Sequence, residues 1–243
     1  MKYYIYISDT KVDMLYPQVP QPLLKKITSS LNIDVKLLGA EVNIGAKGNP
    51  SDETRYAKVK IVSEYIEKHL DVGSVDAPST YFKGTLPMRW TQRTAFGDDL
   101  RVVYFGGTTS RTVVGLGGSV KYVLGNASSE PYSYNRYISF SSLPAIYKLL
   151  RFEYVLYLAA HKLLFPNIEM PKGLMLTMAA YFTTHKIHEP EQQFEFLAKT
   201  LVHGPVDKHL TNKHLIRRTY EPDLDIPQTY VVLGTPIYVA IDD

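Results

Sequence analysis

Apolar and polar residues change their spacing several times within the first 70 residues, and each spacing predicts a different element. The Tyr- and Ile-rich stretch Lys2–Ser8 predicts a strand buried on both faces, and residues 9–13 predict a polar turn. A helix is expected at residues 22–31, because proline suits a first helical turn. Alternation predicts a second strand at 33–44, and an apolar stripe predicts a helix at 51–70. This part of the chain therefore reads βαβα.

Between residues 79 and 140 the pattern changes to consecutive short strands. The predicted strands cover residues 80–91, 100–105, 111–116 and 136–140. Turn residues separate them, among them Gly106-Gly107 and Gly117-Gly118. Such closely spaced strands are typical of an antiparallel meander.

From residue 142 onward the apolar spacing is helical. We expect helices at residues 144–165, 173–184 and 189–203, the last of them beginning at Pro190 and ending at Gly204-Pro205. The end of the chain predicts a β-hairpin, with strands at 230–233 and 237–240 joined around Gly234-Thr235-Pro236.

Together these elements predict an α+β fold. It combines a mixed sheet with a βαβα start, an antiparallel meander, a helical block and a C-terminal β-hairpin. A sub-boundary falls near residue 142, between the mixed-sheet part and the helical block. Because we expect the C-terminal strands to return to the N-terminal sheet, we predict a single interlocked domain over residues 1–243.

The composition limits the catalytic and metal-binding chemistry that the protein can use, and it indicates the compartment in which we expect it. The 243 residues contain no cysteine, which excludes disulfides, thiolate nucleophiles and cysteine-based metal sites. No run of about 18 uncharged apolar residues is present to span a bilayer, and the first residues do not resemble an export signal. We therefore expect a cytoplasmic protein with no membrane partner. A net charge of only +3, with the two signs interspersed, disfavours duplex nucleic acid as a partner.

The end of the first predicted strand carries the first candidate site. Ser8, Asp9, Lys11 and Asp13 lie at the end of this strand, and ligands of open α/β sheets bind beyond the carboxyl ends of the strands. Two carboxylates suit a hard cation such as Mg²⁺, and the lysine suits a phosphate. The alternative is an Asx-turn at Asp9 with the side chains of Lys11 and Asp13 solvated.

A glycine-rich segment at residues 115–121 is the second candidate. Gly117 and Gly118 would let the backbone approach an anion, Ser119 would cap a short helical turn, and Lys121 follows. Arg111, in the preceding hairpin, would border the same surface. The spacing matches neither a P-loop nor a dinucleotide fingerprint. The alternative is a pair of tight turns with bulges in the meander.

Histidines and tyrosines offer weaker candidates. His185 and His188 have a helical spacing that suits a metal, but no carboxylate stands at a diagnostic offset, and we predict no resident metal site. Surface positions near helix ends are the alternative. Tyr132, Tyr134 and Tyr137 lie beside an arginine, a combination suited to base stacking or to a protein interface. Core rings are the alternative.

Four segments of the chain carry a resemblance: YIYISDTKVDMLYP (4–17), GTLPMRW (84–90), GLGGS (115–119) and LGTPIYVA (233–240). Together they resemble an uncharacterised bacterial protein family that we associate with biological-conflict (defence) loci. The segments span most of the chain, so the resemblance is to the whole protein. It implies no established activity, and it favours a sensing or effector role by association only.

Three hypotheses about function follow. The first is a cytosolic binding or signalling protein for a nucleotide-like or phosphorylated small molecule, held by Asp9, Lys11, Asp13, Gly117, Gly118, Ser119 and Lys121. The second is a metal-dependent phosphoester hydrolase or nuclease, with Asp9 and Asp13 as Mg²⁺ ligands. The third is a non-enzymatic interaction component that binds a protein partner or a second copy of the chain. Whether the protein is an enzyme stays open at this point.

Overall fold

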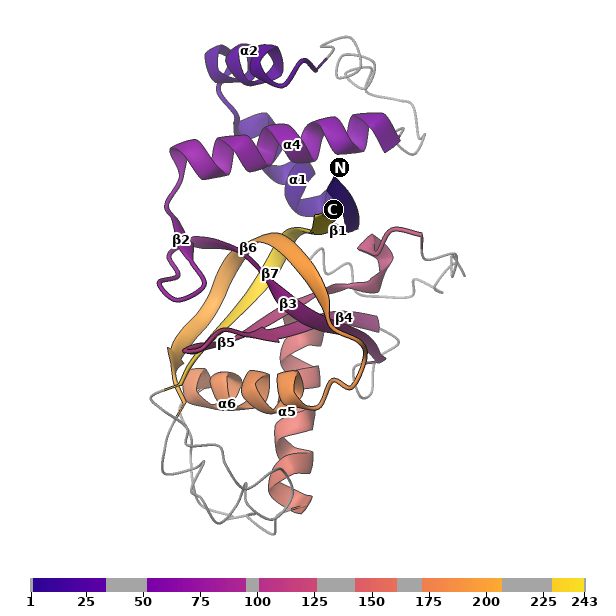
Figure 1. The fold of residues 1–243 in the computed structure, drawn as a ribbon, viewed down its shortest axis with the longest axis vertical. Helices are drawn as coiled ribbons and strands as arrows, with labels where there is room; N and C mark the ends of the chain where they lie inside the picture. Colours follow the sequence, from indigo (N-terminus) through magenta and orange to yellow (C-terminus); the bar gives the residue numbers. More distant parts are fainter. Residues whose placement is uncertain are drawn as a thin grey trace.

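The computed structural model describes residues 2–33, 52–94, 101–125, 143–160, 172–206 and 229–242, and it confirms the α+β class. Helices and strands occur in both halves of the chain (Figure 1). In chain order the elements are β1 (Lys2–Ile7), α1 (Asp9–Leu15), the 3-10 turn η1 (Tyr16–Gln18), α2 (Gln21–Ser30), α4 (Asp52–His69), β2 (Val72–Ser74), β3 (Tyr81–Thr94), β4 (Arg101–Thr108), β5 (Thr112–Ser119), the 3-10 turn η2 (Val120–Tyr122), α5 (Leu143–Ala160), α6 (Lys172–His185), β6 (Gln192–Pro205) and β7 (Tyr230–Asp242).

Five of the strands close into a barrel. β3, β4 and β5 form the predicted antiparallel meander, β7 pairs with β5 in parallel, and β6 pairs antiparallel with both β7 and β3. The order of the strands around the ring is therefore β3-β4-β5-β7-β6. Along the chain, α5 and α6 lie between β5 and β6. This order and these directions are those of an OB-type Greek-key barrel. β1 and β2 extend the sheet beyond the ring, at β7 and β3.

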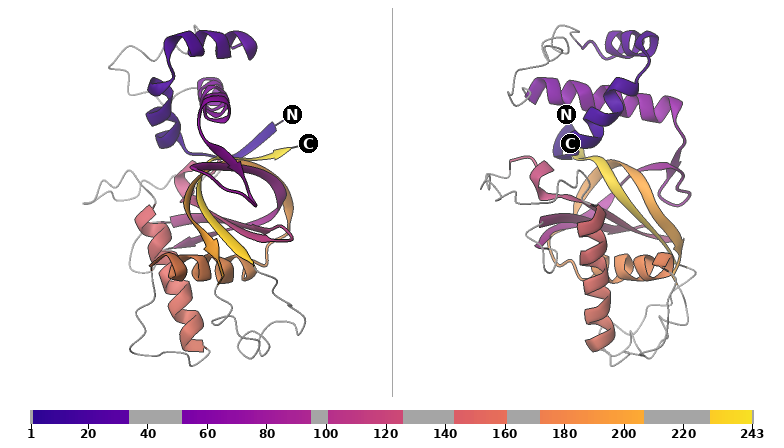
Figure 2. Two further views of the ribbon diagram at one scale, coloured as in Figure 1. Left: turned by 90° about the vertical axis from the view of Figure 1, so that its left-hand side faces the viewer. Right: turned by 180° about the vertical axis from the view of Figure 1, so that it is seen from behind.

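Aromatic side chains fill the inside of the barrel. Phe82, Phe105, Phe194 and Phe196 are fully buried there and meet edge to face, with Phe105 and Phe194 at 5.8 Å between ring centroids. Gly234 of β7 makes room for one of these rings, because a Cβ at that position would lie 2.6 Å from Phe82. The barrel, seen end on in the left view of Figure 2, is thus a packed core and not a channel.

Helices cover the outside of the barrel on two sides (Figures 1 and 2). α1 and α4 pack on β1, β6 and β7, and α2 packs on α4. α5 and α6 pack on the outer face of β4 and β5, where three glycines, Gly106, Gly115 and Gly117, admit α6, the ring of Tyr104 and Ile146 of α5. OB-type barrels bind oligonucleotides on the face of these two strands. In this protein, helices α5 and α6 of the same chain cover that face of β4 and β5.

Three predicted elements were wrong in type. Residues 9–13 belong to helix α1 and not to a polar turn, because Val12 and Leu15 are spaced to pack on α4. Residues 189–203 contain strand β6 and not a helix, because Phe194, Phe196 and Ala198 alternate into the barrel. The C-terminal hairpin is instead one continuous strand, β7, with a bulge where the turn was expected.

The other predicted elements within the described residues are confirmed. They are the first strand, the helices near 22–31 and 51–70, the three strands of the meander and the first two helices of the helical block. β4 continues through Gly106 and Gly107 to Thr108, and β5 continues through Gly117 and Gly118 to Ser119, so the turns predicted at these two glycine pairs were also wrong. The C-terminal strand does return to the N-terminal sheet, because β7 pairs with β1. The strands expected at 33–44 and 136–140 lie outside the described residues, except for Ile33.

Candidate functional site

The bulge in β7 brings together the ends of β1 and β5. One edge of β7 pairs with β5 up to Gly234 and then with β1 from Tyr238 onward. Between the two, Ile237 is the extra residue opposite β6, and its carbonyl accepts a hydrogen bond of 2.9 Å from the backbone N–H of Ser8. Bulges are common next to functional sites because they re-aim backbone groups. We call the polar residues gathered here the bulge site: Tyr6, Ser8, Lys11, Ser119 and Pro236.

Lys11 reaches from α1 back to the bulge. Its Nζ lies 3.2 Å from Ser8 Oγ and donates to the carbonyl of Pro236 at 3.1 Å. Both partners are neutral oxygens, and Lys11 forms no ion pair within the described part of the chain. Burial, together with the positive charge of Lys199 on β6, lowers the pKa of Lys11 from 10.5 to about 8. Near neutral pH the lysine therefore populates both charge states.

Tyr6 carries a buried hydroxyl group into the same place. Its side chain is fully buried, and its hydroxyl makes no hydrogen bond of good geometry among the residues that the structure describes, although it faces the Ser8 side chain and the Ser119 backbone. The ring occupies the space beside Gly118, where a Cβ would lie 2.6 Å from its Cζ. Burial raises the pKa of Tyr6 far above its ordinary value, and the neighbouring Ser8 side chain and Ser119 backbone offset this only in part. The hydroxyl therefore stays protonated at physiological pH.

The two segments singled out in the sequence lie side by side at the bulge. Thr10 Oγ1 of α1 and the hydroxyl of Tyr122 in η2 share a short hydrogen bond. Lys121, next to Tyr122, is exposed and acts electrostatically on Asp9. Its Nζ lies 4.6 Å from the centroid of the Tyr122 ring. The ends of β1 and β5 thus form one surface, with Lys11 and Lys121 both on it.

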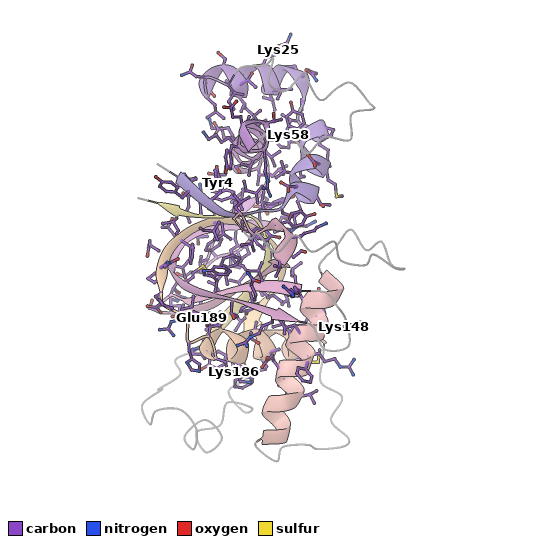
Figure 3. All side chains as sticks on the ribbon, turned by 90° about the vertical axis from the view of Figure 1, so that its right-hand side faces the viewer. Tyr4, Lys25, Lys58, Lys148, Lys186 and Glu189 are labelled. Carbon is purple, nitrogen blue, oxygen red and sulfur yellow. The ribbon has the colours of Figure 1, made fainter. Side chains whose placement is uncertain are left out.

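Asp9 and Asp13 are engaged by α4. Arg55 donates two hydrogen bonds to the Asp9 carboxylate, from Nε at 2.6 Å and from Nη2 at 2.8 Å. Lys58, labelled on α4 in Figure 3, lies 3.3 Å from Asp13 Oδ1. Burial raises the pKa of Asp9 although Arg55 acts to lower it. Both carboxylates therefore hold α1 against α4.

The remaining predicted site residues are more dispersed. Gly117 and Gly118 are buried inside β5, and a Cβ on Gly117 would lie 2.9 Å from Ile146. Their missing side chains make room for other side chains of the protein. Arg111 is exposed in the turn between β4 and β5. It lies roughly 25 Å from Ser119, because a strand rises about 3.3 Å per residue.

Sequence reasoning placed Ser8 at the end of the first strand but gave it no chemical role, and it missed two residues of the bulge site, Tyr6 and Pro236. Ser8 had a usable signal, since a Ser-x-x-Lys spacing puts the lysine one turn after the serine once residues 9–15 are helical. Because residues 9–13 were interpreted as a polar turn, the helical spacing of Ser8 and Lys11 was not recognised. Pro236 was interpreted as part of a hairpin turn. No local pattern distinguishes Tyr6 from the other tyrosines of β1.

The weaker candidates do not assemble a site within the described residues. His185 Nδ1 contacts the carbonyl of Tyr181 at 2.8 Å, whereas His188 is exposed. In the described ranges no three His, Asp or Glu side chains gather as metal ligands would. Tyr132, Tyr134 and Tyr137 lie outside those ranges. None of the described helices is both long and apolar enough to cross a membrane.

Comparison with known proteins identifies a family but no activity. The sequence model of a family described as "Family of unknown function (DUF7019)" matches residues 2–243, and the chain belongs to this family. No curated protein and no solved structure gives a significant match.

Proposed function

We propose that this member of a family of unknown function binds a phosphorylated or nucleotide-like small molecule at the bulge site. The observation that carries the proposal is the charge of Lys11. Its ammonium group is largely buried, its partners are two neutral oxygens, and the cation Lys199 opposes its charge. A cation out of water is costly without a counter-ion. An anionic group on a ligand would supply that counter-ion.

The surroundings of Lys11 favour a phosphate over a single carboxylate. Lys121 and Lys199 are both exposed and flank the site from η2 and β6. Ser8, whose Oγ lies 3.2 Å from Lys11 Nζ, adds a hydroxyl group that can donate to phosphate oxygens. A group with two negative charges and several acceptor oxygens matches this set of donors.

In this proposal Mg²⁺ binds to the protein only as a complex with the phosphates of the ligand. Asp9 and Asp13, the expected Mg²⁺ ligands, hold Arg55 and Lys58 instead. A metal-dependent hydrolase would have to release both ion pairs before it could bind its metal. The binding role needs no such rearrangement.

A thermal-shift screen tests the proposal. The wild-type chain is heated with inorganic phosphate, nucleotides and cyclic oligonucleotides, each with and without Mg²⁺. A ligand at 100 times its dissociation constant stabilises the fold by about 2.7 kcal/mol. We expect Lys11→Met to lose this shift and Lys60→Met, at an exposed position of α4, to keep it. The proposal fails if no ligand at millimolar concentration shifts the wild type, or if Lys11→Met shifts equally.

We also propose that the protein acts in the cytoplasm as a sensor or effector in bacterial defence. The support is the sequence resemblance, which is an association and not a mechanism. Cells that express the wild type or Lys11→Met would be challenged with phage. Equal survival of the two strains, and of a strain without the gene, would remove the defence role while leaving ligand binding intact.

A further inference from the structure

Ser8 and Lys11 meet in a geometry that suits covalent chemistry. Ser8 directly precedes α1, and Lys11 follows one helical turn later, so that its Nζ comes within 3.2 Å of Ser8 Oγ. The second bond of Nζ, to the carbonyl of Pro236, fixes its position on the other side. A hydroxyl nucleophile within hydrogen-bond reach of a base that is itself oriented by a third group is the recurring arrangement of nucleophilic catalysis.

We propose that Ser8 is a nucleophile and Lys11 its general base, and that the pair accepts a small acyl group from an ester. This activity rests on the same site as the proposed ligand binding but goes beyond it. Binding an anion needs Lys11 as a cation. Activating Ser8 needs the neutral amine, whose lone pair accepts the hydroxyl proton while an N–H still donates to Pro236.

The environment of Lys11 makes the neutral amine available. With a pKa of about 8, a substantial fraction of Lys11 is neutral at physiological pH, whereas an exposed lysine is almost fully charged. Two effects lower the pKa of Lys11: the burial of its side chain and, to a lesser extent, the positive charge of Lys199. Tyr6 adds a protonated hydroxyl that faces the Ser8 side chain and the Ser119 backbone but makes no hydrogen bond of good geometry in the described part of the chain. This hydroxyl is suited to donate to the carbonyl oxygen of the ester.

The reaction proceeds in two balanced steps. Ser8 Oγ bonds to the carbonyl carbon while its proton passes to Lys11 Nζ. The bond from that carbon to the leaving oxygen then breaks, and the leaving oxygen takes the proton from Nζ. Water next attacks the acyl-serine, with Lys11 again accepting and returning one proton, which frees the acid and restores Ser8. Ser8 has only 1% of its surface exposed, so an ester reaches Oγ only when the side chains around it move, and the smallest acyl groups, such as acetyl, need the least movement.

Incubation of the whole chain with p-nitrophenyl acetate tests this inference. Release of p-nitrophenolate gives the rate, and peptide mass spectrometry locates the acetyl group. We expect acetyl-Ser8 in the wild type, and a rate that rises with pH to a plateau above about 8, where Lys11 is neutral. Lys11→Arg keeps the positive charge but removes the base. It should slow acetylation at least about 100-fold, the usual contribution of a general base.

The control variants separate this inference from the proposed ligand binding. Ser8→Ala should lose the acetyl adduct, whereas Lys60→Met, at an exposed position of α4 outside the bulge site, should keep both the adduct and the thermal shift with phosphate. Circular dichroism checks that each variant folds. If Ser8→Ala does not fold, Ser8→Cys replaces it, because the thiol should be acetylated in a Lys11-dependent way. Acetylation of Ser8 that is equally fast in Lys11→Arg, or acetyl groups confined to surface lysines, would overturn the dyad while leaving the binding proposal standing.

Discussion

Lys11 places an ammonium group where burial and Lys199 both oppose its charge. Its pKa is about 8 in the folded chain and 10.5 ordinarily, so between these values the unfolded chain binds more protons than the folded one. The contribution of Lys11 to the free energy of unfolding therefore rises with pH from about 8 towards 10.5 and stays level below 8. At 1.36 kcal/mol per pKa unit the rise amounts to at most about 3 kcal/mol.

Urea unfolding between pH 7 and 9.5 measures this effect. We expect the wild type to gain stability over the alkaline part of this range relative to Lys11→Met, whose side chain has no charge to lose. Lys60→Met is the matched control and should follow the wild type, because Lys60 is exposed on α4. Parallel curves for the wild type and Lys11→Met would show that the charge of Lys11 is not opposed by its surroundings.

Gly115 shows how a single missing side chain lets β4, β5 and α6 meet. A Cβ at this position would collide with the hydroxyl of Tyr104. That hydroxyl is held by the carbonyl of Ala180 at 3.2 Å and by Thr184 Oγ1 at 3.1 Å. Gly115→Ala should therefore destabilise the fold by about 1 to 3 kcal/mol, as overpacking does in other cores.

A double-mutant cycle identifies the collision itself. Tyr104→Phe removes the hydroxyl and should cost about 1 kcal/mol for its lost hydrogen bonds. Adding Gly115→Ala to Tyr104→Phe should then cost less than Gly115→Ala alone, because the obstructing atom is gone. Gly204→Ala is the control, since the nearest atom to its new Cβ lies 4.0 Å away. Additive costs would contradict this account.

The candidate site was predictable only in part at the residue level. Lys11 and the segment 117–121 stand out in the sequence because charged and glycine-rich stretches after strands are recognisable locally. Arg55 and Lys58 do not, because the partner of a carboxylate depends on which helix packs against it. Asp9 and Asp13 therefore looked like metal ligands, although α4 engages both. Pro236 joins the site only through the pairing of β7 with three other strands.

At the scale of elements, α6 ends on a histidine whose protonation works against folding. His185 lies in the last turn of α6, with its ring centroid 4.3 Å from that of Tyr181. Burial and, to a lesser extent, the charge of Arg89 lower the pKa of His185 below 6.5, although its bond to the Tyr181 carbonyl acts in the opposite sense. In mildly acidic solution His185 thus binds more protons in the unfolded chain than in the folded one, and its contribution to stability falls as the pH drops below about 6.5.

Chemical denaturation at pH 7.5, 6.5 and 5.5 checks this dependence. His185→Gln should flatten the loss of stability between the first and last of these values. His188→Gln should leave the slope unchanged, because His188 is exposed beyond the end of the helix. A wild-type slope that persists in His185→Gln would assign the acid sensitivity to other groups.

The two strands that the sequence misassigned, β6 and β7, have stretches that are buried on both faces. In β6, Phe194, Phe196 and Ala198 point into the barrel, while Leu197 is buried under α4. The apolar positions 194, 197, 198, 201 and 202 therefore also fit a helix, and only the barrel decides between the two patterns. β7 was divided at Gly234 and Pro236 because both residues mark turns. In the barrel Gly234 accommodates the ring of Phe82, and Pro236 lies at the bulge, where a strand tolerates proline.

At the scale of the molecule, the barrel takes strands from both sides of residue 142. β3, β4 and β5 precede this residue, whereas β6 and β7 follow it. β6 closes the ring by pairing with β3, and β7 joins β5 to β1. The aromatic interior draws Phe82 and Phe105 from the first part and Phe194 and Phe196 from the second. Neither part holds a complete barrel.

This interlocking predicts one cooperative unfolding transition for the whole chain, in place of separate transitions for a mixed-sheet part and a helical part. Trp90, the single tryptophan, stacks on Phe105 and reports on the barrel by its fluorescence, while far-ultraviolet circular dichroism reports on the helices. The two signals should follow the same urea curve, as two-state unfolding requires. Fragments 1–142 and 143–243 should each lack cooperative unfolding alone and regain it when mixed. Separate midpoints, or a fragment 1–142 that unfolds cooperatively by itself, would place a real domain boundary near residue 142.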